Sequence, residues 1–260
     1  MRWAVCLACA IALASGSAAA RPVRRLFEPT DLQLENAGVA EFDFQTGLIR
    51  GDAHYRLVVP DFEIDLGITR RLELDVDGTV NLEDQSGTRT FDHVSPDNLW
   101  VSAKVGLAAL TIDLGHSDRD PALGFGLQIG PKLPTARQAE GIGVEGVALV
   151  GLNWRRTQAV LNLGGLVDPG NGNAGRPKAI EGGIDFTQGL DARGLWSFVA
   201  GLGGVAYTTA DNDQLTLTAG LELDPTEMLT LSLQALVGLI QGSDRYGVLL
   251  EVSPKVRLWH

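Results

Sequence analysis

The stretch from Arg71 to Glu83 alternates between apolar and polar side chains. In a strand, successive side chains point to opposite faces, so this stretch would have one apolar face and one acidic face. A helix would spread both classes around its circumference, so the period favours a strand. The apolar members are Leu72, Leu74, Val76 and Val80, and the polar members are Glu73, Asp75, Asp77, Thr79 and Asn81.

Two kinds of sheet could contain such a strand. In a soluble sheet the apolar face meets a protein core and the acids face water. In a membrane barrel the apolar face meets lipid and the acids line the interior. This one stretch leaves both interpretations open, so the rest of the chain must decide between them.

Residues 1–20 are typical of a secretory signal peptide. Arg2 supplies a positive end, Trp3 to Ala14 is an apolar run, and Ser17 to Ala20 offers a small-residue cleavage site. The run is too short for a membrane-spanning helix. The only cysteines, Cys6 and Cys9, lie inside this segment. We therefore expect an exported chain with no disulfide and no thiolate metal site.

The charge of the chain argues against nucleic acid as a partner. The formal net charge is -11, and it becomes -12 once Arg2 leaves with the signal peptide. After the signal peptide, no segment has the run of about 18 apolar residues that a membrane helix needs. Any later membrane crossing would have to use strands, and only a closed barrel satisfies every backbone group in lipid.

After a lead-in at residues 21–38, strand patterns recur through residues 39–260. About twelve strands of about ten residues each are expected, a length and an even number typical of bacterial barrels. Pro60 predicts a bulge or kink, and a change of phase at Ala108 and Ala109 predicts another bulge. The expected strands are Val39–Leu48, His54–Gly67, Arg71–Glu83, Leu99–Leu107, Ala122–Leu133, Gly143–Trp154, Thr157–Val167, Ile180–Gln188, Gly194–Thr208, Leu215–Leu223, Leu229–Ile240 and Tyr246–Leu258.

The connections differ in length according to the strand that they follow. Three long polar segments, at 84–97, 134–141 and 168–177, follow odd-numbered strands. Most connections after even-numbered strands are short, as at Arg155-Arg156. Long external loops and short periplasmic turns have this asymmetry. The sequence therefore predicts a transmembrane antiparallel up-and-down β-barrel.

Aromatic residues agree in part with that prediction. Trp154 and Trp196 lie next to expected periplasmic turns, Tyr246 begins the last strand, and Trp259 almost ends the chain. Such positions are typical of the aromatic girdles at membrane interfaces. Trp100 falls on the polar face and does not fit a girdle. Aromatic residues near strand ends also occur in other sheets, so this observation alone does not decide.

One resemblance rests on four segments, which are Phe27–Leu32, Leu57–Gly67, Leu123–Pro134 and Val252–Lys255. These segments resemble the outer-membrane barrel proteins of the meta-pathway of phenol degradation. The resemblance implies a Gram-negative outer-membrane transporter, with hydrophobic or aromatic compounds as a solute class, and brings no catalytic residue. The last strand also resembles the strand by which barrel assembly machinery recognises outer-membrane proteins.

Inward-facing acids are the candidate functional residues. They would either favour cations in the lumen or pair with Lys104, Lys132 or Arg257. Oxygen ligands could hold calcium, but the EF-hand loop pattern is absent, so the sequence predicts no metal site and no cofactor. The candidate lumen-lining residues are Glu41, Asp43, Glu63, Asp65, Glu73, Asp75, Asp77, Glu145, Glu181, Asp185 and Glu222.

An enzymatic role has little support in the sequence. A membrane-embedded hydrolase would need a serine, a histidine and an orienting polar group in contact. Asp92-His93-Val94-Ser95 and His116-Ser117-Asp118 lie in expected connections, where solvated side chains are the simpler interpretation. The other two histidines of the chain are His54 and His260. The glycines of Gly124-x-Gly126 alternate within a strand, where they relieve crowding rather than bind phosphate.

The function predicted from the sequence is passive passage of a small solute through an outer-membrane barrel. The expected partners are outer-membrane lipid and the barrel assembly machinery. One alternative is a closed barrel with a structural or adhesive role. A second alternative is a soluble periplasmic β-protein.

Overall fold

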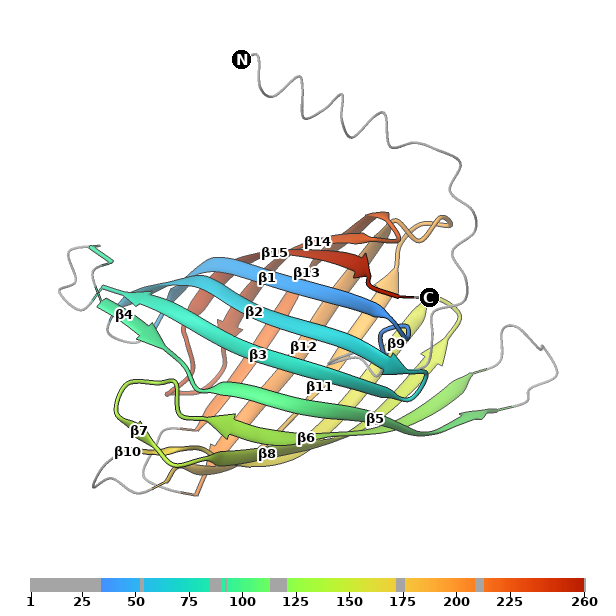
Figure 1. Ribbon diagram of the computed structural model, residues 1–260. Helices are drawn as coiled ribbons and strands as arrows, with labels where there is room; N and C mark the ends of the chain where they lie inside the picture. Colours follow the sequence, from blue (N-terminus) through green and yellow to red (C-terminus); the bar gives the residue numbers. More distant parts are fainter. Residues whose placement is uncertain are drawn as a thin grey trace, which may run out of the picture.

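The computed structural model describes residues 34–51, 54–84, 90–91, 93–112, 121–171, 176–208 and 213–259. Its strands form a closed antiparallel barrel, in which β1 lies beside β15 (Figure 1). In the described ranges no helix is long and apolar enough to cross a membrane. The predicted signal peptide and most of the lead-in lie outside the described residues.

Twelve long strands make the barrel wall, as the sequence predicts. Each is hydrogen-bonded to its neighbour along the chain, and the pairing of β1 with β15 closes the ring. The long strands are β1 (Val39–Arg50), β2 (Tyr55–Thr69), β3 (Leu72–Glu83), β5 (Leu99–Thr111), β6 (Ala122–Leu133), β8 (Gly143–Trp154), β9 (Thr157–Val167), β11 (Lys178–Gly189), β12 (Trp196–Tyr207), β13 (Gln214–Thr226), β14 (Leu229–Gly238) and β15 (Tyr246–Arg257).

Three short strands lie in segments that the sequence predicts as loops. β4 (His93–Pro96) extends the sheet beyond β3, within the segment 84–97. β7 (Ala139–Glu140) pairs with β10 (Gly170–Asn171), which ties two long connections together. These pairings join segments that are polar and have no clear alternation, so the pattern of the sequence does not predict them.

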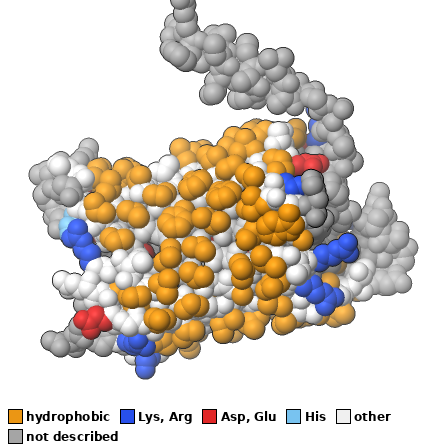
Figure 2. All heavy atoms as spheres, in the orientation of Figure 1, with side chains coloured by type: hydrophobic (Ala, Val, Ile, Leu, Met, Phe, Trp, Pro, Cys, Tyr) orange, Lys and Arg blue, Asp and Glu red, His pale blue; other side chains and the backbone are white. Residues whose placement is uncertain are grey.

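The outer surface of the barrel is apolar between its two ends (Figure 2). On β14, Leu233 is 51% exposed, whereas the neighbouring Ser232 is 8% exposed and points inward. An apolar surface that encircles the wall is far larger than the patches of a soluble protein, so it is a lipid-facing surface and not that of a soluble periplasmic protein. The outward row of β14 and its extension is Leu229, Leu231, Leu233, Ala235, Val237 and Leu239.

Both predicted bulges are present. The register between β2 and β3 shifts between Val58 and Asp61, around Pro60, which has no N–H to donate to the ladder. A second shift lies between Gly106 and Ala108 on β5. The expected strand Leu215–Leu223 ends too early, because β13 continues through Asp224-Pro225-Thr226 with a register shift there. The hydroxyl of Thr230 donates to Asp224 Oδ1 (2.6 Å) and holds this irregular end of the strand.

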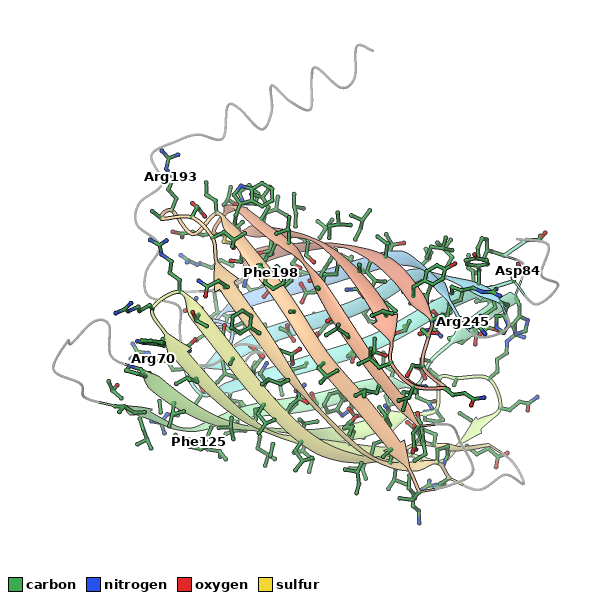
Figure 3. The ribbon with its side chains drawn as sticks, turned by 180° about the vertical axis from the view of Figure 1, so that it is seen from behind. Arg70, Asp84, Phe125, Arg193, Phe198 and Arg245 are labelled. Carbon is green, nitrogen blue, oxygen red and sulfur yellow. The ribbon has the colours of Figure 1, made fainter. Side chains whose placement is uncertain are left out.

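The connections divide between two ends of the barrel. Arg70 and Arg193 lie at the short-turn end, which carries the connections 70–71, 155–156, 190–195 and 227–228 (Figure 3). Asp84 and Arg245 lie at the opposite, long-loop end. The connection 112–121 between β5 and β6 is the exception, because it is long and lies at the short-turn end; its residues 113–120 are outside the described ranges.

Exposed aromatic residues lie at both ends of the wall. Trp154 ends β8 and Trp196 begins β12 at the short-turn end. At the long-loop end, the hydroxyls of Tyr55 and Tyr246 are 3.2 Å apart. These positions agree with an aromatic girdle. Trp100 is inside the barrel, as its place on the polar face predicts, and its Nε1 donates to the carbonyl of Gly130 (3.3 Å).

Candidate functional site in the barrel interior

Every predicted lumen-lining acid lies on the inward face of its strand, alternating with outward neighbours. The acids differ in how far they are enclosed. Those that are buried are Glu41, Asp65, Glu73, Asp75 and Glu145. Those that are half-buried are Asp43, Glu63, Asp77, Glu181, Asp185 and Glu222.

Acids stand directly opposite one another on β1, β2 and β3. Glu41 pairs in register with Asp65, and Asp65 pairs with Asp75. In the next row Glu63 is opposite both Asp43 and Asp77. Like charges opposite each other in a sheet destabilise it. This charged wall of the lumen, formed by the inward side chains of β15, β1, β2, β3, β5 and β6, therefore needs compensating cations.

Two buried or half-buried lysines supply part of that compensation. Lys104 Nζ lies 3.0 Å from Glu73 Oε1, and the backbone N–H of Glu35 donates to the other oxygen of Glu73. Lys255 Nζ donates to Glu35 Oε1 (2.6 Å) and Glu41 Oε2 (2.7 Å). Pairing with Lys104 is one of the alternatives that the sequence left open, and this pair is present. Where the sequence predicted Arg257, the structure uses Lys255, two positions earlier on the same face of β15.

A third lysine joins the charged wall to a long loop. Lys132 Nζ lies 2.7 Å from Glu145 Oε2 and 3.4 Å from Asp168 Oδ1. Pairing of Lys132 with an inward acid, which the sequence left open as an alternative, is therefore present. Since Asp168 follows β9, this network fixes the start of the connection 168–177 at the long-loop end.

The lead-in reaches the mouth of the barrel, a placement that the sequence left open. The N–H of Gly38 donates to the carbonyl of Gly67 (2.8 Å), and Leu34 and Glu35 are buried. A side chain at Gly67 would meet the carbonyl oxygens of Glu35 and Asn36, so only glycine admits this close approach. The alternation pattern does not assign Glu35 to the charged wall, because Glu35 precedes the first strand.

On the opposite side of the barrel, β12 has small inward side chains. These are Ser197, Val199, Gly201, Gly203 and Val205. A Cβ atom placed on Gly203 would meet no atom of the described residues within 4 Å. The described residues therefore leave room for a side chain beside Gly203.

The histidines considered for a hydrolase do not form a catalytic arrangement with described residues. His93 Nε2 lies 3.4 Å from Arg137 Nη1, a contact that does not activate a serine. His54 precedes β2 at the long-loop end. His116 and His260, together with Asp92, Ser117 and Asp118, lie outside the described residues.

Comparison with known proteins identifies no family. No family model matches the chain, and no curated protein matches it. Among solved structures, the β domain of the Bordetella autotransporter BrkA has a TM-score of 0.46 at 13% identity, covering 85% of this chain and 99% of that chain. The translocator domain of autotransporter NalP from Neisseria meningitidis has a TM-score of 0.42 at 10% identity, covering 83% and 86%.

A third solved structure, an anion-selective porin from Comamonas acidovorans, has a TM-score of 0.38 at 8% identity, covering 84% of this chain and 98% of that chain. The class of this protein follows from its own geometry. The strands pair in a closed ring, the outer surface is apolar and the interior is charged. Together these features define a transmembrane β-barrel. The resemblance to the meta-pathway barrel family stays a prediction.

Proposed function

We propose that the protein is a Gram-negative outer-membrane channel for the passive passage of small solutes. The observation that carries this proposal is the open space beside Gly203, on a wall of small inward side chains. Barrels of about eight strands are filled by side chains, and those of 16–18 strands leave an aqueous channel, so twelve strands lie between these limits.

The charge of the lumen supports a preference among solutes. Lysines pair with the buried acids Glu41, Glu73 and Glu145, and other acids line the inward face as half-buried side chains. These half-buried acids include Asp77, Glu181 and Asp185. Carboxylates between low-dielectric walls concentrate cations and repel anions. We therefore propose cation preference for charged solutes. The family resemblance extends the proposal to hydrophobic or aromatic compounds.

Liposome swelling tests passage directly. Vesicles that contain the refolded barrel should admit a small neutral sugar faster than vesicles without protein. Gly203→Trp should slow this uptake severalfold, because the indole would occupy the open side of the lumen. Leu202→Trp is the matched control, since Leu202 is adjacent and points to lipid, and it should leave uptake unchanged.

The alternative is a closed barrel with a structural or adhesive role. It is favoured by the enclosed Lys104–Glu73 pair and by the entry of Leu34 and Glu35 at one mouth, both of which fill part of the lumen. In the same assay a closed barrel would admit sugar no faster than protein-free vesicles. Equal uptake by the unmodified protein and Gly203→Trp would also contradict the channel.

A further inference from the structure

Three buried carboxylates meet where β2 and β3 pair. One oxygen from each of Asp65, Glu73 and Asp75 lies within 4.8 Å of the others. Oxygens of Glu41 and Asp43 lie within the same distance of Asp65. Two oxygens bound to one calcium ion, at about 2.3–2.6 Å each, are at most about 5 Å apart, so these spacings suit a shared ion.

Asp65 is the residue that its protein surroundings leave unsatisfied. It is 0% exposed, and neither carboxylate oxygen accepts a hydrogen bond from the described residues. Asp75 is satisfied at Oδ2, which accepts from Ser102 Oγ (3.0 Å) and Gln128 Nε2 (2.9 Å), but not at Oδ1. A buried carboxylate without a donor is costly, and either a proton shared between Asp65 and Asp75 or a bound cation would relieve that cost.

The lysines do not balance the charge of this cluster. Among the described residues, two ammonium groups, Lys104 and Lys255, are paired with members of this cluster. The cluster has six carboxylates, which are Glu35, Glu41, Asp43, Asp65, Glu73 and Asp75. Six against two leaves a formal surplus of four negative charges. Lys104 is paired with Glu73 and Lys255 with Glu35 and Glu41, so Asp65 and Asp75 Oδ1 keep most of the surplus.

We propose that Asp65, Asp75 and Glu73 form a calcium site inside the barrel wall, with Glu41 and Asp43 as neighbouring carboxylates. Carboxylate oxygens are the ligands that hard divalent cations prefer, and calcium accepts six to eight of them in flexible geometry. Magnesium usually keeps several waters in strict octahedral geometry, for which this enclosed site is poorly suited. The ion would join β2 to β3 and relieve the repulsion between opposed acids.

The calcium site does not depend on an open lumen, so its test is independent of the test of the proposed function. Calcium binding is measured by isothermal titration calorimetry on the refolded, chelator-treated barrel in detergent. We expect binding of calcium to the unmodified protein and weaker binding of magnesium. Asp65→Asn should lower calcium affinity at least about tenfold. Asp185→Asn is the control, because this inward acid lies on β11, away from the proposed site. Its Oδ2 accepts a hydrogen bond from Asn162 Nδ2 (3.1 Å).

Thermal unfolding gives a second test, because calcium should reverse the order of the melting temperatures of Asp65→Asn and the unmodified barrel. In chelator, Asp65→Asn should melt at a higher temperature than the unmodified barrel, because it removes a charge from a repulsive cluster. In calcium the order should reverse, because a ligand that binds only the folded state stabilises it. A merely structural Asp65 would give the same order in both buffers.

Two results would overturn the site. One is the absence of calcium binding, together with identical melting of the unmodified barrel in calcium and chelator. The other is an equal loss of affinity in Asp65→Asn and Asp185→Asn, which would place the binding elsewhere. The first measurement needs only the unmodified protein, so it decides even if Asp65→Asn fails to refold.

Discussion

Lys104 and Glu73 form an ion pair inside the barrel wall, with Nζ 3.0 Å from Oε1 and neither residue more than 1% exposed. Lys104→Met leaves Glu73 uncompensated among other acids. Breaking a buried pair by removing one partner costs about 3–5 kcal/mol. We expect a loss of that size in the free energy of unfolding, measured by denaturant titration of the refolded barrel in chelator.

The double variant Lys104→Met with Glu73→Gln completes this test. Replacing both members of a buried pair is often much less costly than removing one. The double variant should therefore recover a large part of the stability that Lys104→Met loses. The single variant Glu73→Gln is measured as well. A loss in the double variant equal to the sum of the two single losses would show that the two side chains do not interact in the folded protein.

The two faces of β14 make a second prediction. Leu233→Arg places a cation at an exposed mid-strand position that faces lipid, which should cost about 2–4 kcal/mol. Ser232→Arg should cost much less, because the inward neighbours across the sheet are Glu222 and Glu251. Refolding stability in lipid vesicles compares the two variants. Equal costs would mean that the faces are assigned wrongly.

Two inward glycines predict opposite effects of one methyl group. A Cβ on Gly130 would collide with the backbone of Val101 and Ser102 on β5, so Gly130→Ala must move one strand against the other. Gly203→Ala meets no described atom within 4 Å and should be tolerated. The fraction of each variant that refolds into vesicles is the measurement. Similar yields for the two would contradict the packing described between β5 and β6.

The orientation of the barrel in the membrane makes a fourth prediction. Long loops are external in bacterial barrels, so Gln138, exposed at the long-loop end, should face the outside of the cell. Gln138→Cys should react with an impermeant maleimide on intact cells. Arg156→Cys, at the short-turn end, should react only after lysis. Labelling in the reverse order would invert the orientation.

The alternation of side chains predicts the barrel wall well because lipid requires one apolar face and the strand period is two. That is why Ala122–Leu133 and Gly143–Trp154 are predicted with the same bounds as β6 and β8. The short strands β4, β7 and β10 are not predictable in this way. Their pairing depends on which loops the closed barrel brings together.

The partners of the inward acids could be predicted only in part. The sequence shows that Asp65 and Asp75 face inward, but the register that puts them opposite each other depends on the stagger of β2 against β3. Lys255 was missed in favour of Arg257 because both lie on the inward face of β15. Glu35 was missed because a segment before the first strand has no periodicity to indicate its position.

Conductance in a planar bilayer tests the central claim, an open lumen that favours cations, most directly. The unmodified refolded protein should produce discrete conductance steps, and a salt gradient should give a reversal potential of the sign expected for cations. That preference should fade as salt rises, because the field of the inward acids is screened. Absence of any steps, or a reversal potential of the opposite sign, would contradict the account.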